Sequence, residues 1–208
     1  RIDSSGLTVN APARAPLYRL EAVLADKAGW VREKLAEMLA RQAPARIWQD
    51  GETLPFLGGG LRLTVIAGRT RAAPRLADKQ LLAEVGDATD NGAVRAKVMK
   101  WYRSQALAHF SERVALYAAR LNVPIPPLSL SNAATRWGSC NSRGEVRLNW
   151  RLIKAAPYLI DYVVAHELAH LKHLDHSAAF WHTVERLFPG CLAARRELKA
   201  NGHRLHTF

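Results

Sequence analysis

The segment His166-Glu-Leu-Ala-His170 restricts the fold of this chain more than any other feature of its sequence. Histidines four residues apart lie one turn apart on one face of an α-helix, so both can bind a single metal ion if the segment is helical. Glu167 can then reach a water molecule on the metal without being a ligand itself. Apolar neighbours such as Val163 and Leu171 indicate a buried helix, where these polar side chains are costly unless they have a function. The motif therefore predicts a catalytic metal site, with a chance match on a structural helix as the alternative.

Three further histidines follow the motif closely: His173, His176 and His182. A catalytic zinc ion usually has three protein ligands and a water molecule. His173 lies about 10 Å of helical rise beyond His166, at roughly 1.5 Å per residue, which is too far for both to bind one ion on a straight helix. His176 can bind if the chain turns back after the motif, and Asp175 or Ser177 can cap a following helix. We therefore predict that the two motif histidines and His176 bind one Zn²⁺.

The other polar side chains near the motif have open roles. His173 is expected to be a solvated histidine at the helix end, with a contact to substrate or to a ligand as the alternative. His182 is expected on the next helix, as an ordinary side chain or as an oxyanion donor. Tyr162 and Arg151 are further candidate oxyanion donors, and the sequence does not rank them.

The histidine spacing also matches that of the metzincins, but two further features of that class are missing. The glycine that lets a metzincin chain turn is replaced by His173. Both methionines, Met38 and Met99, precede the motif, so no Met-turn can follow it. The metzincin interpretation is therefore excluded.

Composition narrows the class of protein further. The chain has 208 residues, 49% of them hydrophobic, enough to bury a core without disulfides. No apolar run reaches the roughly 18–20 residues that span a membrane, so no membrane partner is expected. Two cysteines, Cys140 and Cys191, are too few for a disulfide framework and suit a reducing compartment.

The net charge of +12 is unevenly spread. Residues 91–208 hold 17 of the 30 basic residues, only 7 of the 18 acidic residues, and all eight histidines. A basic surface of this size fits a nucleic acid, an anionic membrane or an acidic partner, and it equally fits a surface that only keeps the protein soluble.

Hydrophobic periodicity and turn residues predict an α+β protein in two parts. Strands are expected at 7–10, 61–66, 80–85, 128–132, 135–140 and 145–150, and helices at 19–41, 93–121, 157–171 and 177–188. The stretch 67–92 is rich in Gly, Ala and Asp, which places a soft boundary near its end. We therefore expect a smaller strand–helix–strand part over 1–90 and a catalytic domain over 91–208.

Several segments of the C-terminal part carry a resemblance to a known family. They are Arg136-Trp-Gly-Ser-Cys140, Arg147-Leu-Asn-Trp150, Ala156-Pro157, Tyr162-Val-Val-Ala-His-Glu-Leu-Ala-His170, His176-Ser177 and Phe180-Trp181. In this order they resemble the YgjP-like metallopeptidases, bacterial relatives of the SprT and WLM zinc proteases. The resemblance is strong over about 125–190. It is weaker over 1–120, where Trp30, Asp50-Gly51-Glu52 and Leu57-Gly58 fit the family.

The resemblance implies a zincin-like core, in which helices pack on a small, mainly antiparallel sheet, and a cytoplasmic protein. It assigns His166, His170 and His176 as metal ligands and Glu167 as the catalytic glutamate. His173 stands where relatives often differ, which leaves the metal assignment untouched.

These residues together predict a zinc-dependent peptidase in which Glu167 acts as general base on a metal-activated water. The strand Trp137-Gly138-Ser139-Cys140 can pair with an extended substrate. The side chains of Trp137 and Trp150 are expected to pack in the core, and Cys140 is expected to be a small buried residue rather than a ligand.

Two alternatives belong to other functional classes. The first is a nucleic-acid-associated SprT-like protease or binding protein whose basic C-terminal half contacts DNA or RNA. The second is a zinc-stabilised module without turnover. It is disfavoured because structural zinc sites use four protein ligands, and Glu167 would have no purpose there.

Overall fold

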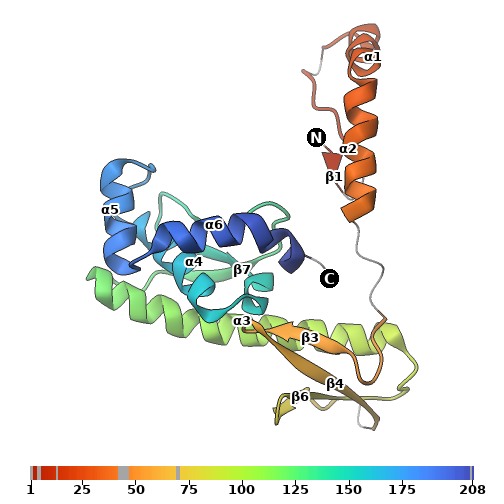
Figure 1. The fold of residues 1–208 in the computed structure, drawn as a ribbon, viewed down its shortest axis with the longest axis vertical. Helices are drawn as coiled ribbons and strands as arrows, with labels where there is room; N and C mark the ends of the chain where they lie inside the picture. Colours follow the sequence, from red (N-terminus) through yellow and green to blue (C-terminus); the bar gives the residue numbers. More distant parts are fainter. Residues whose placement is uncertain (1, 4–5, 13, 42–46, 69–70, 207) are drawn as a thin grey trace. The chain divides into compact units, whose positions relative to one another are not determined.

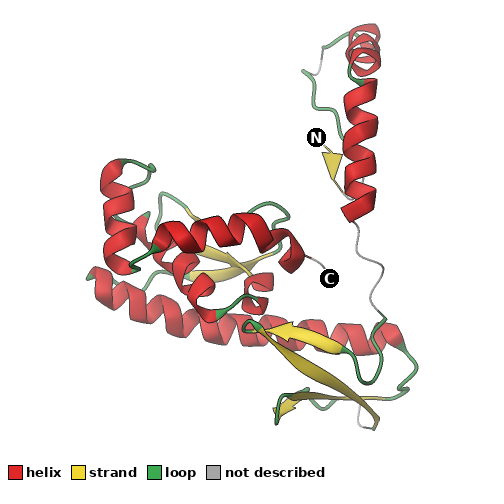
Figure 2. Ribbon diagram, in the orientation of Figure 1, coloured by secondary structure: helices red, strands yellow, loops and turns green. Residues whose placement is uncertain are grey.

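The computed structural model describes residues 2–3, 6–12, 14–41, 47–68, 71–206 and 208. The chain divides into two compact units, residues 1–46 and residues 47–208 (Figure 1). Strands and helices occur in separate groups along both units, and the predicted α+β class is confirmed (Figure 2).

The first unit contains a short hairpin and two helices. Its elements are β1 (Ile2–Asp3), β2 (Gly6–Leu7), α1 (Leu17–Asp26) and α2 (Ala28–Arg41). The sequence predicts one helix over 19–41, but Lys27 interrupts it with φ −92° and ψ 4°. The strand predicted at 7–10 overlaps β2 only at Leu7.

The second unit opens with a four-stranded sheet in the order β3-β4-β6-β5. Its strands are β3 (Thr53–Phe56), β4 (Gly59–Ala67), β5 (Arg75–Ala77) and β6 (Gln80–Val85). The central pair, β4 and β6, is parallel, and both outer pairs are antiparallel. Along β6 the apolar Leu81, Ala83 and Val85 alternate with more exposed residues and are buried. The strands predicted at 61–66 and 80–85 are therefore confirmed, while β3 and β5 were not predicted.

The long helix α3 (Asn91–Leu121) contacts β6 of this sheet and β7 of the next one (Figure 1). Asp90 caps its N-terminus by accepting a hydrogen bond from the backbone N–H of Ala93 at 2.9 Å. Asn122 ends the helix in the left-handed conformation, with φ 56°. Proline at 124 follows, as the sequence pattern predicts.

The second sheet has the order β7-β9-β8, from β7 (Leu128–Ser131), β8 (Gly138–Cys140) and β9 (Val146–Asn149). β8 and β9 form an antiparallel hairpin, but β9 pairs in parallel with β7. The sheet is therefore mixed rather than mainly antiparallel, because the second strand of the hairpin, and not the first, lies beside β7. This order makes β8 an edge strand.

Three helices and two 3₁₀ segments complete the unit: η1 (Trp150–Lys154), α4 (Pro157–Ala169), α5 (Ala178–Leu187), α6 (Cys191–Asn201) and η2 (Gly202–His206). α4 contacts α3, α5, α6 and β8, so it lies at the centre of this part of the fold. The helices predicted at 157–171 and 177–188 correspond to α4 and α5, whereas α6 was not predicted.

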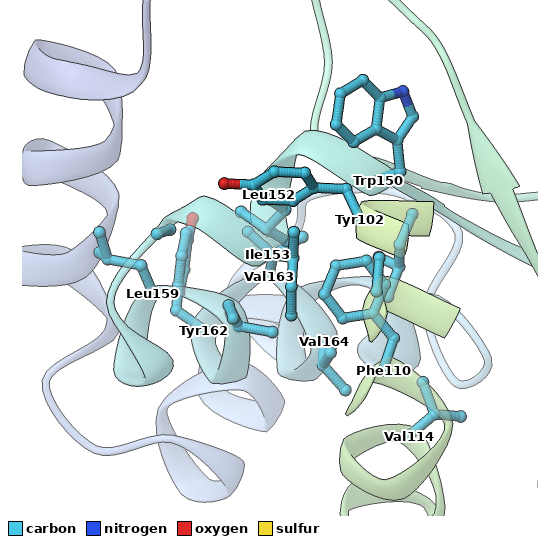
Figure 3. Close-up of a cluster of buried hydrophobic side chains, with 14 of the residues drawn as sticks. Tyr102, Phe110, Val114, Trp150, Leu152, Ile153, Leu159, Tyr162, Val163 and Val164 are labelled. Atoms are coloured by element: carbon cyan, nitrogen blue, oxygen red, sulfur yellow. The ribbon is translucent and has the colours of Figure 1, made fainter. Parts of the chain in front are cut away.

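Apolar side chains from α3, η1 and α4 meet in one core (Figure 3). Phe110 and Tyr102 of α3 and Ile153 of η1 are fully buried there, as is Val164 of α4. Burial of apolar area of this extent is the main force that holds α4 in place. Trp150 is only 2% exposed, which confirms its predicted place in the core.

The division of the chain differs from the boundary expected near residue 90. Along the chain, the first compact unit ends at residue 46 and the second begins at residue 47. Leu54, Leu63 and Leu81 of the first sheet are fully buried in the same core cluster as Tyr102 of α3. A shared core joins β3, β4 and β6 to α3, and we propose on this ground that the division lies near residue 46 rather than near residue 90. Among the described residues, no helix is both long and apolar enough to cross a membrane.

Candidate metal centre

The helix α4 brings the motif to the centre of the unit. Pro157 occupies the first turn, where its missing N–H needs no partner, and the helix ends at Ala169. A tight turn follows, in which the backbone N–H of His173 bonds to the carbonyl of Ala169 at 3.0 Å. Ser177 then caps α5 by accepting a hydrogen bond from the backbone N–H of Phe180. The chain therefore turns back directly after the motif, as the predicted use of His176 requires.

The three predicted ligands meet at one point. His166, His170 and His176 each offer a ring nitrogen, and these atoms all lie within 4.8 Å of one another. Nε2 of His176 is 3.2 Å from Nε2 of His166. Two nitrogens bound to one zinc ion at about 2.0–2.1 Å in tetrahedral geometry would be about 3.3 Å apart. The donor set and its spacing therefore fit a zinc ion.

The backbone of the turn fixes the ring of His170. Its Nδ1 lies 3.0 Å from the carbonyl oxygen of His173. A carbonyl can only accept a hydrogen bond, so Nδ1 carries the proton and Nε2 keeps its lone pair for a metal. His173 thus contacts a predicted ligand, His170, through its main chain, while its own side chain is half-buried.

His166 is the most enclosed of the three histidines. Its Nδ1 is buried and has no hydrogen-bond partner among the residues that the structure describes. Burial, followed by the neighbouring His170 and His176, lowers the pKa of His166 to about 4. The ring is therefore neutral at pH 7, the form in which imidazole binds a metal.

An aromatic residue of α5 lies against all three rings. The ring of Phe180 is fully buried, with its centroid 4.9 Å from that of His166, 4.6 Å from that of His170 and 4.7 Å from that of His176. Because the phenyl ring packs against all three imidazole rings, it restricts their orientations, as a metal site of fixed geometry needs. The sequence contains Phe180 as part of the family resemblance, but only the structure shows this contact.

Two further side chains form a second layer, in which Trp181 contacts the histidines and Arg195 contacts Trp181. Trp181 has its ring centroid 5.7 Å from that of His166 and 6.0 Å from that of His176. The guanidinium of Arg195, from α6, lies 4.6 Å from the centroid of Trp181. Its positive charge contributes to the lowered pKa of His166. Arg195 was not predicted, because the helix that carries it was not predicted either.

Glu167 faces away from solvent toward β8. It is 6% exposed, and burial raises its pKa to about 8, opposed by the charge of Arg136. Gly138 of β8 is packed so closely on it that a Cβ atom there would lie 2.4 Å from Oε1. Only glycine leaves room for the carboxylate at this position. The close approach joins the glutamate to the strand that was predicted to bind substrate.

The remaining predicted side chains lie in different surroundings. Tyr162 lies one turn before His166, and the centroids of the two rings are 6.0 Å apart. It is 6% exposed, and burial is the chief cause that raises its pKa to about 12. His182 of α5 is exposed. Arg151 donates hydrogen bonds to Asn132 and to the carbonyl of Phe208, at 2.6 and 2.8 Å, so its guanidinium is engaged elsewhere.

Two residues of the β8 segment have structural surroundings of their own. Trp137 is half-buried and stacks on His206 of η2, with ring centroids 4.1 Å apart. Cys140 is half-buried, and its thiol donates to the carbonyl of Asn141 at 3.6 Å. Cys140 is not part of the histidine group, in keeping with the expectation that it is no ligand.

Comparisons with known proteins agree with this chemistry. The family model described as YgjP-like, metallopeptidase domain, matches residues 1–201. Because that description names a metallopeptidase, the alternative of a nucleic-acid-binding protein is not favoured. A comparison with curated proteins finds no match.

Two solved structures are similar to this chain. One is the metallopeptidase zymogen abylysin of Pyrococcus abyssi, with 22% identity, a TM-score of 0.41, and coverage of 48% of this chain and 98% of that one. The other is the metallopeptidase zymogen jannalysin of Methanocaldococcus jannaschii, with 20% identity, a TM-score of 0.39, and coverage of 45% and 94%.

Proposed function

Because this chain belongs to the YgjP-like metallopeptidase family, we propose that it is a zinc-dependent peptidase whose metal is held by His166, His170 and His176. The observation that supports this most directly is the convergence of the three ring nitrogens, with His166 and His176 only 3.2 Å apart. Three imidazoles leave a fourth tetrahedral position for water or substrate, as in catalytic zinc sites. A structural site would use that position for a protein ligand.

Glu167 is the proposed general base. When bound, zinc polarises the scissile carbonyl and lowers the pKa of the attacking water. Glu167 takes the proton of that water and delivers it to the leaving amine, which is the usual path for a single acid–base group in peptide hydrolysis. Gly138 leaves room for this carboxylate beside β8, because a Cβ atom there would lie 2.4 Å from Oε1.

The extended substrate is proposed to lie along β8. This strand is the edge of its sheet and passes directly beside Glu167. An edge strand can accept a further strand through its backbone groups. Among the candidate oxyanion donors, Tyr162 is supported by its position one turn from His166. Replacement of Tyr162 by Phe is then expected to lower kcat by about 10²–10³-fold with zinc retained, since that is the usual cost of one lost donor.

The two central assignments are tested by metal content and turnover measured together. Glu167→Gln should bind about one zinc per chain and lose hydrolysis of unfolded protein substrates, because the base is gone and the ligands remain. His176→Ala should lose tight zinc binding, because one of three ligands is removed. Full turnover by Glu167→Gln would remove Glu167 from its role. Full zinc occupancy in His176→Ala would point to His173 or His182 instead.

A further inference from the structure

The free edge of β8 offers specific backbone groups. The antiparallel pairs are Gly138 with Leu148, Ser139 with Arg147 and Cys140 with Val146. Ladder bonds join Trp137 to Asn149 and Asn141 to Glu145, so the odd-numbered residues of this segment direct their backbone groups toward β9. By the alternation of an antiparallel ladder, Gly138 and Cys140 direct theirs away from β9. Beyond that edge, the described part of the sheet has no further strand.

The two faces of the hairpin differ in character. Val146 and Leu148 are buried, and the Gly138 paired with Leu148 packs on Glu167, so this face is turned toward α4. Arg147 lies between them in the chain and is exposed, on the face away from α4. Its cross-strand neighbour is Ser139, whose small side chain leaves the path from Arg147 to the edge of β8 open.

A pocket of about 300 Å³ adjoins this edge. It is lined by Arg136, Ser139, Cys140, Asn141, Glu145 and Arg147. Its one carboxylate is already engaged, because Glu145 accepts a hydrogen bond from Asn141 at 2.7 Å and lies 3.6 Å from the guanidinium of Arg143. The two lining arginines are exposed, so their guanidinium groups can take up a ligand from solvent.

We propose that this pocket, with Arg136 and Arg147, is a specificity subsite that binds an acidic side chain of the substrate. The inference rests on the proposed function, because it assumes a peptide paired with the edge of β8. Side chains of a paired strand point alternately to the two faces. A residue beside the scissile bond therefore points to the face of Ser139 and Arg147. Two guanidinium groups around one pocket favour a carboxylate over a neutral or basic side chain.

The test compares matched peptides cleaved by the full-length, zinc-loaded protein. The probes are internally quenched peptides, acetylated and amidated at their ends, in sets of three that differ only by Glu, Gln or Lys at one scanned position. At one position next to the scissile bond, kcat/KM for the Glu peptide should exceed that for the Gln peptide by about tenfold, as a charge-assisted hydrogen bond implies. The Lys peptide should be the slowest.

Variants of the arginines assign this preference to the pocket. Arg147→Gln should lower the Glu-to-Gln ratio, because one of the two guanidinium groups is removed, and Arg147→Glu should lower the ratio further. Arg196→Gln is the matched control, because Arg196 of α6 is an exposed arginine that neither lines the pocket nor contacts Glu145 in the ion pair described above. This control should keep the ratio of the unmodified protein. Equal cleavage of the Glu and Gln peptides at every position would overturn the subsite and leave the proposed peptidase standing.

A binding experiment tests the subsite independently of peptide hydrolysis. If no peptide is cleaved, the proposed function fails, and the same peptides are titrated by fluorescence anisotropy into the zinc-loaded Glu167→Gln variant. A roughly tenfold lower Kd for the Glu peptide than for the Gln peptide, with a smaller difference in the further variant Arg147→Gln, would support the subsite. Equal Kd values would overturn it.

Discussion

At the residue scale, Gly138 packs directly on Glu167, the proposed general base. A methyl group at this position would lie 2.4 Å from Oε1 and 2.5 Å from Cγ of Glu167, far inside van der Waals contact. Gly138→Ala should therefore displace the carboxylate and reduce kcat/KM by at least about 10²-fold, the scale expected when a catalytic group is misplaced by about 1 Å. Zinc content should stay near one per chain, because the three histidines are not touched.

Gly59→Ala is the matched control for this substitution. Gly59 also begins a strand, but an added Cβ would meet only the carbonyl of Phe56, at an ordinary 3.6 Å. The control should keep its activity and unfold at a similar temperature. An active Gly138→Ala protein would show that Glu167 can take a second position.

The sequence predicts the positions of some site residues but not of others. His166, Glu167 and His170 are fixed by helical spacing, and Ser177 shows its capping role by its residue type and position. The role of His173 could not be predicted, because its contact with His170 is made by a backbone carbonyl that every residue possesses. The oxyanion donors could not be ranked, because their distances from the metal depend on tertiary packing.

At the scale of helices, the contact between α3 and α4 carries charged groups that make stability depend on pH. Arg113 of α3 forms two hydrogen bonds with Asp161 of α4, at 2.5 and 2.7 Å. His109 lies one turn before Arg113, and its Nε2 is buried without a hydrogen-bond partner among the described residues. Burial, with a further contribution from Arg113, lowers the pKa of His109, while Glu112 and Asp161 oppose this shift. The folded protein therefore resists protonation of this ring.

A lowered histidine pKa gives the direction of the pH effect. The unfolded chain binds a proton at His109 near pH 6.5 and the folded chain does so only at lower pH, so the stability contributed above pH 6.5 is lost as the pH falls. His109→Gln removes this proton site. Between pH 7.5 and pH 5.5, the urea midpoint of the unmodified protein should fall more than that of His109→Gln. Parallel midpoints in the two proteins would show that His109 titrates normally in the folded state.

Elements were predicted where their pattern is strong in sequence. The buried residues of α3 recur at three and four positions, and β6 alternates, so both follow from periodicity. α6 was missed because only Cys191, Ala194 and Leu198 are buried along it, and two of these residues are small. The spacing of three and four after Pro189-Gly190 is the signal that could have revealed this helix.

At the scale of the whole molecule, the position of the core predicts which truncations fold. All described members of the core cluster lie between Trp48 and Phe208. A chain of residues 47–208 should therefore unfold cooperatively and bind about one zinc ion. A chain of residues 91–208, cut at the boundary expected from sequence, loses the fully buried Leu54, Leu63 and Leu81. Each lost buried leucine costs about 2–5 kcal/mol, against a total stability of about 5–15 kcal/mol, so this chain should not fold.

Circular dichroism melts and zinc analysis of both truncated chains check this prediction. A folded, zinc-binding chain of 91–208 would restore the boundary near residue 90. The boundary expected near residue 90 stays a prediction that these truncated chains test, because a polar, Gly-rich stretch reports that a segment is exposed and not whether the elements around it share a core. That information depends on contacts between residues far apart in the chain.

The three proposed metal ligands lie close together in the sequence, and this bears on how the site forms during folding. His166, His170 and His176 belong to one helix end and the turn after it, so their assembly requires little loop closure. Gly138, by contrast, reaches Glu167 only after the hairpin of β8 and β9 has docked on α4. The proposed ligands therefore come together through contacts between residues near in the chain, whereas the placement of Glu167 beside Gly138 needs contacts between residues far apart. We expect that a chain whose hairpin has not docked on α4 would bind the metal without hydrolysing peptides.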